Sequence, residues 1–84
     1  DHAEAHNNLG VFLDGRGRSD EAMAQFFEAV RWKPGYAEAH SNLGYLLEKA
    51  GRKEEAAVHY AEALRLKPGF PAALQGLERL RGAK

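Results

Sequence analysis

The chain has 84 residues and carries twelve Lys plus Arg side chains against twelve Asp plus Glu, so its formal net charge is zero. This length is enough for one small domain, and a balanced charge offers no excess positive field to a nucleic-acid backbone or an anionic membrane. The absence of cysteine excludes disulfide frameworks, thiolate metal ligands and thiol nucleophiles.

The first part of the chain predicts an antiparallel pair of helices. A buried stripe at helical spacing is formed by His6, Leu9, Gly10 and Leu13. Asp1 is a candidate N-cap for this helix, and Gly17 follows as the left-handed residue that ends it. A second helix carries Ala22, Phe26, Ala29 and Val30. It stops before Pro34, because the residue preceding a proline is pushed out of the helical conformation.

The same unit is written again 34 positions later. The letters AEAHNNLG from Ala3 recur as AEAHSNLG from Ala37, and RWKPGY recurs as RLKPGF. The second stripe consists of His40, Leu43, Gly44 and Leu47. Gly51 takes the place of the turn glycine, and the following helix carries Ala56, Tyr60, Ala63 and Leu64 before Pro68. Small residues on both helices predict close approach, with Phe26 and Tyr60 filling the remaining space.

A third copy covers one helix, residues 71–82. Pro71 is tolerated in a first helical turn. We expect three leucines, Leu74, Leu77 and Leu80, to cover the second hairpin. The residues expected to face water are Glu78, Arg79, Arg81 and Lys84. This helix therefore reads as a terminal cap, which solenoids require.

The order of large and small residues resembles the tetratricopeptide repeat family. The matching positions are Leu9, Gly10, Ala22, Phe26, Ala29 and Pro34, and again Leu43, Gly44, Ala56, Tyr60, Ala63 and Pro68. The chain departs from the family at His6 and His40, where Trp is usual, and at Leu13 and Leu47, where Tyr is frequent. The resemblance implies an all-α fold, a right-handed superhelix of antiparallel hairpins, with repeats at 3–36 and 37–70 in a single domain spanning 1–84.

In this family the first helix of each hairpin lines a concave face. The residues opposite the buried stripes are Glu4, Asn7, Asn8, Val11, Asp14 and Gly15, then Glu38, Ser41, Asn42, Tyr45, Glu48 and Lys49, then Ala72, Gln75, Gly76 and Arg79. We expect a polar, somewhat acidic face with an apolar floor at Val11 and Tyr45. From this set the predicted peptide-binding residues are Asn8, Asn42, Asn7, Val11, Ser41, Tyr45, Glu4, Glu38, Glu48 and Arg79.

Asn8 and Asn42 stand one repeat apart and are the central candidates. An amide side chain both donates and accepts, so a row of them can pair with the backbone of an extended peptide. The arrangement resembles two rungs of the asparagine ladder in the O-linked N-acetylglucosamine transferases. The alternative interpretation is that both are ordinary solvated helix residues. The carboxylate clamp of chaperone-binding members is disfavoured, because only Asn42 fits it and the cationic positions are missing.

Four other features have simpler structural interpretations. His6 and His40 are too far apart to share a metal, since neighbouring hairpins separate equivalent residues by about 8 to 10 Å and ligation needs about 2 Å. We expect Trp32 to fill the joint between the hairpins. Phe27 is either half-buried packing or an exposed contact. The charged run that starts at Arg52 is a solvated turn and helix start.

These observations favour a scaffold that binds a protein or an extended peptide, with no cofactor, no nucleic acid and no insertion into a membrane. An enzyme is disfavoured, because Ser19 and Ser41 lack triad partners and the glycines sit at turns rather than in a phosphate loop. The alternative is a structural segment or a homo-oligomer that associates through the first helix, which lacks a covering helix. The register of Asp1 and His2 suggests a preceding repeat. With no signal peptide or membrane-spanning run in the sequence, the cytoplasm is the default compartment.

Overall fold

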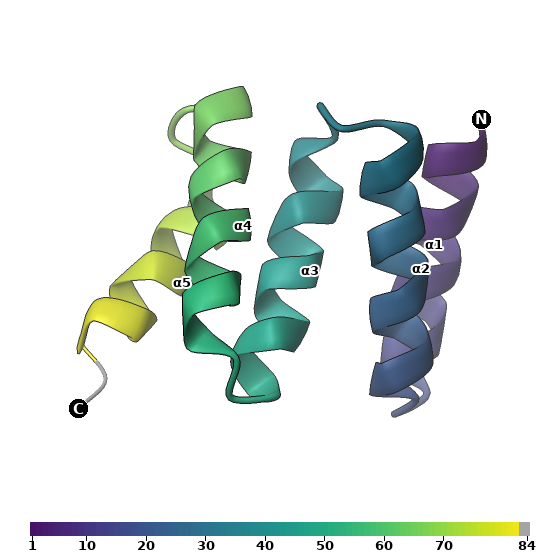
Figure 1. The fold of residues 1–84 in the computed structure, drawn as a ribbon, viewed down its shortest axis with the longest axis horizontal. Helices are drawn as coiled ribbons and strands as arrows, with labels where there is room; N and C mark the ends of the chain where they lie inside the picture. The colour runs from purple at the N-terminus through teal and green to yellow at the C-terminus, as the bar shows by residue number, and fades with distance from the viewer. Residues whose placement is uncertain (83–84) are drawn as a thin grey trace.

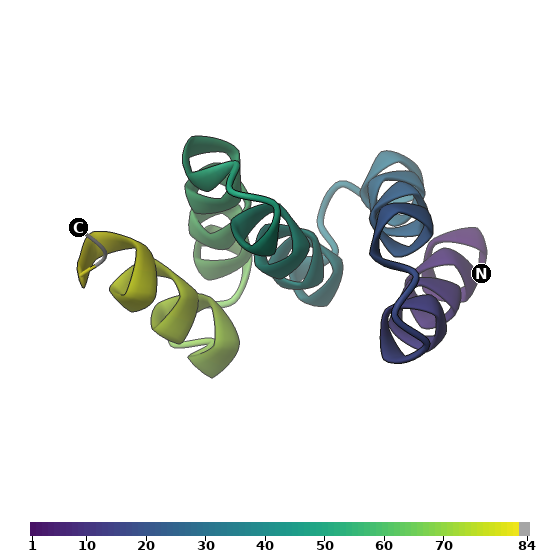
Figure 2. The same cartoon turned by 90° about the horizontal axis from the view of Figure 1, so that it is seen from below.

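The computed structural model describes residues 1–82 as five α-helices: α1 (His2–Gly15), α2 (Ser19–Trp32), α3 (Ala37–Lys49), α4 (Lys53–Leu66) and α5 (Pro71–Gly82). Helices α1 and α2 form one antiparallel hairpin and α3 and α4 a second, and α5 packs against α4 and α3 (Figure 1). The two hairpins and the last helix follow one another along the long axis (Figure 2). The predicted all-α class of helical hairpins is confirmed.

The helix ends follow the predicted local chemistry. The Asp1 carboxylate caps α1 by accepting a hydrogen bond from the Glu4 backbone N–H at 2.7 Å. The turns inside the hairpins place Gly17 at φ +78° and Gly51 at φ +82°. Glycine occupies this left-handed region without the steric cost that a Cβ would impose. Helices α2 and α4 end before the two prolines, at Trp32 and Leu66.

In each hairpin the core forms where an aromatic ring of the second helix lies against a glycine of the first helix. The Phe26 ring fills the space beside Gly10, where a Cβ would come within 2.6 Å of it. Tyr60 does the same for two helices at once: a Cβ at Gly44 would lie 3.0 Å from its ring, and one at Gly76 would lie 2.3 Å away. Tyr60 is therefore wedged between α3 and α5 and holds the last helix against the second hairpin.

The two apolar stripes that the sequence predicts to be buried differ in their exposure. Leu43 is 0% exposed, whereas Leu9, its equivalent one repeat earlier, is 44% exposed. The prediction for Leu9 is wrong because α3 packs on α2, while within residues 1–82 no helix lies on the corresponding side of α1. Leu74 is also wrongly predicted as covered: it is 46% exposed, and of the three α5 leucines only Leu77 and Leu80 pack on the core. Lys84 lies outside the described residues.

Trp32 does not fill the joint between the hairpins. Its ring is 57% exposed and stacks on the His2 ring, with centroids 4.7 Å apart and planes 21° apart. The prediction fails because the last turn of α2 directs this side chain toward the start of α1 instead of toward α3. Phe27 is 39% exposed and contacts the His59 ring edge-on at 6.1 Å, so it is half-buried packing between α2 and α4.

Candidate binding groove

A hollow of about 230 Å³ lies between α3 and α5, with the Tyr60 side chain of α4 in its wall. Its lining residues are Ser41, Asn42, Tyr45, Tyr60, Ala72, Gln75 and Arg79. Helix geometry places them together, because residues three and four apart share one face of a helix. Six of the seven come from α3 and α5, which each present one polar face to the hollow. We call this hollow the α3/α5 groove.

At one end of the groove a carboxylate, a guanidinium and a phenol form hydrogen bonds with one another. Arg79 donates to Glu48 from Nε to Oε2 and from Nη2 to Oε1, both at 3.0 Å. The Tyr60 hydroxyl donates to Glu48 Oε1 at 2.8 Å and accepts from Arg79 Nη2 at 3.3 Å. Two-point pairing fixes the orientation of the guanidinium as well as its position. It leaves the two N–H groups of Arg79 Nη1 outside the pair with Glu48.

The charge states of this cluster follow from its contacts. Hydrogen bonds from Arg79, and more weakly from Tyr60, lower the pKa of the Glu48 carboxyl below its usual range, although burial acts in the opposite direction. Burial, followed by the hydrogen bond to Glu48, raises the pKa of the Tyr60 phenol. At neutral pH the cluster therefore holds a carboxylate, a guanidinium and a neutral phenol. Glu48 is thus occupied by protein partners.

The exposed apolar surface of the groove is the ring of Tyr45. This side chain is 45% exposed, with Lys49 Nζ at 5.2 Å and Arg79 Cζ at 6.0 Å from the ring centroid. A cation over the face of an aromatic ring is attracted by its quadrupole. Lys49 also approaches Asp14 of α1 at 3.9 Å. The Tyr45 ring therefore has two cationic side chains near it and still remains accessible.

The two predicted asparagine rungs are not equivalent. Asn42 Nδ2 donates to Asn7 Oδ1 at 3.1 Å, which joins α3 to α1, whereas Asn8 is exposed. Asn7 is only 8% exposed and Ser41, its equivalent one repeat later, is 4% exposed. The first repeat has Asn where the second has Ser, so it supplies an extra amide that reaches the neighbouring repeat. The doubled Asn7 and Asn8 were the only signal for this contact in the sequence.

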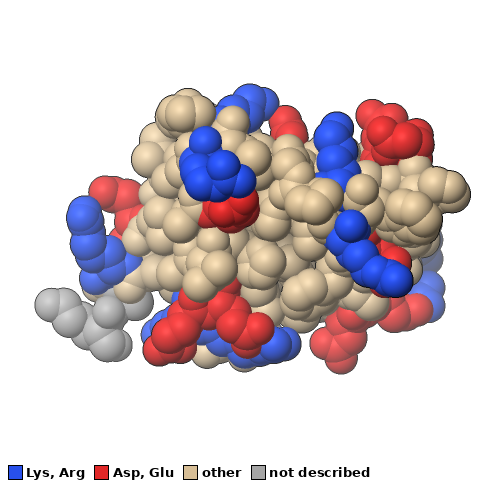
Figure 3. Space-filling view, turned by 45° about the horizontal axis from the view of Figure 1, so that its top comes forward, with Lys and Arg blue, Asp and Glu red and all other residues tan. Residues whose placement is uncertain are grey.

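The predicted acidic residues lie on two helices, Glu4 on α1 and Glu38 and Glu48 on α3, and two of the three are paired with cations. Lys67 Nζ donates to Glu38 Oε2 at 2.9 Å, and this hydrogen bond lowers the pKa of the Glu38 carboxyl. Because Glu48 is paired with Arg79, the expected acidic character of the face is largely neutralised. Figure 3 shows positive and negative side chains side by side over the face it presents, without a field of one sign. Glu4 is exposed on α1.

The structure brings four of the predicted binding residues to the groove, namely Ser41, Asn42, Tyr45 and Arg79. It leaves Glu4, Asn8 and Val11 exposed on α1, away from the groove lining, and it buries Gly76 under the Tyr60 ring. Tyr60 was expected only in the core, yet it also lines the groove. Its equivalence to Phe26 gave no sign of this, because the hydroxyl is the part that reaches Glu48.

The histidines of the two stripes have separate partners. His6 contacts Gln25, and His40 contacts His59. Within residues 1–82 no group of three or more His, Asp or Glu side chains is placed to hold a metal ion. No helix in the described part of the chain is both long and apolar enough to cross a bilayer.

Comparison with known families agrees with the observed hairpins. Two models described as tetratricopeptide repeat match the chain, one at residues 3–36 and the other at residues 37–70. No match was found among curated proteins. Tetratricopeptide repeats generally mediate protein–protein interactions and typically act as scaffolds without catalytic activity. With both hairpins matched and the helical architecture in agreement, the chain belongs to the tetratricopeptide repeat family.

Proposed function

We propose that the chain binds an extended segment of another protein along the face formed by α1, α3 and α5, with the α3/α5 groove as the main contact. The observation that carries this proposal is the groove itself. It combines amide and hydroxyl groups, an accessible aromatic ring and a guanidinium held in place by Glu48. Such a set suits a ligand that presents backbone groups together with occasional apolar side chains.

The polar contacts would be made by groups that the fold leaves free. Asn42 uses one N–H on Asn7, so its carbonyl oxygen and second N–H are available to a ligand backbone. Gln75 offers a second amide across the groove, and Arg79 offers its Nη1 donors. Because Glu48 already fixes the guanidinium, little side-chain entropy is lost when a ligand carbonyl binds there.

The remaining predicted residues would extend the contact toward α1. Asn8 and Val11 are exposed on that helix, where they can meet the continuation of a peptide that leaves the groove. The pairing of Glu38 and Glu48 with cations leaves only Glu4 of the three predicted carboxylates to favour a positively charged peptide. We therefore expect binding that depends weakly on salt, since exposed and unpaired charges contribute most of the salt dependence.

A displayed library of random peptides tests this mechanism with no assumed partner sequence. Peptides selected on the wild-type chain are measured again on the groove variant Tyr45→Ala/Gln75→Ala and on the surface control Val58→Ala. Val58 is 64% exposed on α4 and does not line the groove. We expect binding to the groove variant to be weaker by about tenfold or more, and binding to the control to be unchanged. Equal binding to both folded variants would refute the groove.

A second candidate function is self-association through α1. The face of α1 that carries Ala5, Leu9 and Phe12 is exposed, whereas its equivalents in α3, Ala39, Leu43 and Leu46, are at most 2% exposed. A second copy could cover this apolar face. Sedimentation across a concentration series, compared with Leu9→Glu, tests it: association lost in the variant supports this function, and a wild-type monomer at all concentrations contradicts it.

A further inference from the structure

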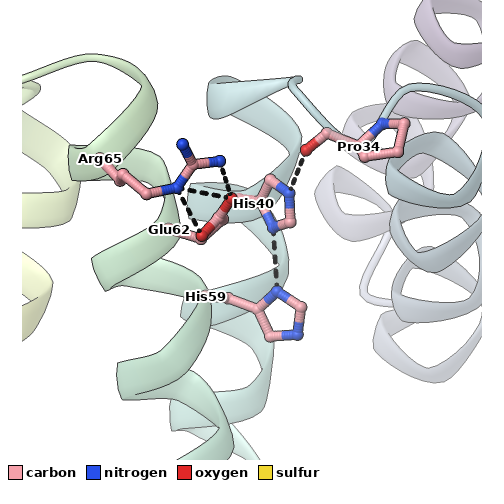
Figure 4. A network of polar contacts seen from close by, with 5 residues as sticks. All are labelled: Pro34, His40, His59, Glu62 and Arg65. Carbon is pink, nitrogen blue, oxygen red and sulfur yellow. Dashed lines mark hydrogen bonds and ion pairs between the residues drawn. The ribbon is translucent and has the colours of Figure 1, made fainter.

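Two histidines of the second hairpin meet edge to edge. His40 Nδ1 of α3 lies 3.1 Å from His59 Nδ1 of α4 (Figure 4). The ring planes are 25° apart, and the centroids are separated by 5.3 Å. Centroids that are much farther apart than the two nitrogens mean that the rings point at each other instead of lying face to face. The contact is therefore an N–H···N hydrogen bond between two imidazoles.

The backbone fixes where the protons are. His40 Nε2 lies 2.8 Å from the carbonyl oxygen of Pro34, in the linker between α2 and α3. A carbonyl oxygen only accepts, so His40 Nε2 carries a proton. In its neutral form His40 then has a lone pair on Nδ1, and His59 must donate its Nδ1–H to it. One chain of bonds thus runs from α4 through α3 to the linker between the two hairpins.

The pair can take up one proton without breaking this chain, but not two. The first proton keeps the bond whichever ring takes it: on His59 Nε2 it leaves His59 as the donor, and on His40 Nδ1 it makes His40 the donor to a His59 protonated at Nε2. A second proton would have to bind the remaining Nδ1 lone pair, which is the one that accepts this bond. Both nitrogens of the 3.1 Å contact would then be donors, with two positive charges facing each other.

The first hairpin has an equivalent pair of residues whose contact is not broken by protonation. His6 and Gln25 occupy the positions of His40 and His59 one repeat earlier, and His6 Nδ1 lies 2.7 Å from Gln25 Oε1. The amide oxygen is an acceptor, so the His6 Nδ1–H donates to it whether the imidazole is neutral or charged. The same position therefore tolerates protonation in the first repeat and resists it in the second.

We propose that His40 and His59 form a pH-sensitive lock, in which uptake of a second proton breaks the bond between α3 and α4 and loosens the second hairpin and its linker. The lock shares a helix with the α3/α5 groove, because α3 also carries Ser41, Asn42 and Tyr45. Acidification would thus act on the helix that supplies three of the seven residues lining the groove.

The groups around the two histidines determine in which direction the stability of the fold changes with pH. Burial first, and the charge of His40 second, lower the pKa of His59, while Glu55 and Glu62 on its own helix raise it less. Glu62 is itself held by Arg65, and α2 contributes the uncharged Phe27 ring. A histidine with a lowered folded pKa stabilises the fold above its unfolded pKa of about 6.5, and this stability is lost as the pH falls through the lowered value.

Denaturant unfolding of the whole chain between about pH 7.5 and pH 5 tests the lock. His59→Gln copies the first repeat, because an amide can donate to neutral His40 or accept from charged His40. We expect the unfolding equilibrium constant of the wild type to rise by up to about tenfold per pH unit below about pH 6.5, and that of His59→Gln to rise clearly less. An equal pH dependence in both chains would overturn the proposal.

The reciprocal variant Gln25→His provides an independent measurement. It places a second histidine pair in the first hairpin, and we expect the steeper pH dependence to appear there as well. Nitrogen-detected NMR of the wild type gives a readout that does not depend on stability: at neutral pH, His40 should be protonated at Nε2 and His59 at Nδ1. The opposite tautomers would contradict the proton positions on which the lock depends.

Discussion

Replacing Gly76 by alanine tests the central packing contact of the fold. This glycine lies in α5 against the ring of Tyr60, and an added Cβ would sit 2.3 Å from Cζ and 2.5 Å from Cε1 and Cε2. Carbon atoms in contact are normally about 3.5 to 4.0 Å apart. The ring cannot move aside easily, because Tyr60 is 1% exposed and its hydroxyl is bound to Glu48.

The expected loss of stability is the difference between two opposing effects. Alanine is favoured over glycine inside a helix by about 1 kcal/mol. Forcing an extra carbon into a filled core costs about 1 to 3 kcal/mol, and the severity of this overlap places Gly76→Ala in the upper half of that range. The net change is a loss of about 1 to 2 kcal/mol, which corresponds to a lower Tm by about 4 to 16 °C in a domain of this size.

Thermal and denaturant unfolding followed by circular dichroism measure this loss, and Gly15→Ala is the matched control. Nothing lies within 4 Å of a Cβ at Gly15, so the control should be unchanged or up to about 1 kcal/mol more stable. In a Tyr60→Phe background the cost of Gly76→Ala should shrink, because the ring is no longer anchored to Glu48. A Gly76→Ala chain as stable as the control would refute the wedge formed by Tyr60.

Pairs of equivalent or neighbouring residues give three further predictions. Leu43→Ala should lower the unfolding free energy by about 2 to 5 kcal/mol, and Leu9→Ala by less than about 1 kcal/mol, because only Leu43 is fully buried. Denaturant titrations measure both losses. Similar losses in the two variants would contradict the difference in burial between the two stripes. Gly51→Ala should cost about 1 to 2 kcal/mol, because its φ of +82° is left-handed, whereas Gly35→Ala in the linker should cost less, and melting temperatures compare the two. The stability that Glu48 contributes should be present above its unfolded pKa of about 4.3 and be lost as the pH falls through its lowered folded pKa, since the unfolded chain binds the proton more tightly. Acid unfolding of the wild type and Glu48→Gln should therefore converge at low pH, and a constant difference between them would count against the ion pair with Arg79.

Much of the candidate groove could be predicted from position in the repeat. Ser41, Asn42, Tyr45 and Arg79 lie opposite the buried stripes, and the structure brings all four to one hollow. The repeat pattern could not predict which other side chains of the protein these residues bind. Arg79 holds Glu48 across 31 residues and Asn42 holds Asn7 across 35. Such contacts depend on the angles between helices, which no local pattern encodes.

The sequence by itself determined the hairpins and their ends, because these depend on interactions within one or two helical turns. Glycines in the left-handed conformation and prolines end the helices through their effect on the adjacent backbone. The 34-residue period of large and small residues shows that the same hairpin occurs twice. Only the tertiary structure decided which copy of a residue is buried. Leu9 and Leu43 have nearly the same local sequence, yet the first is exposed and the second is in the core. Burial depends on the neighbouring helix, and similar repeats do not have identical neighbours.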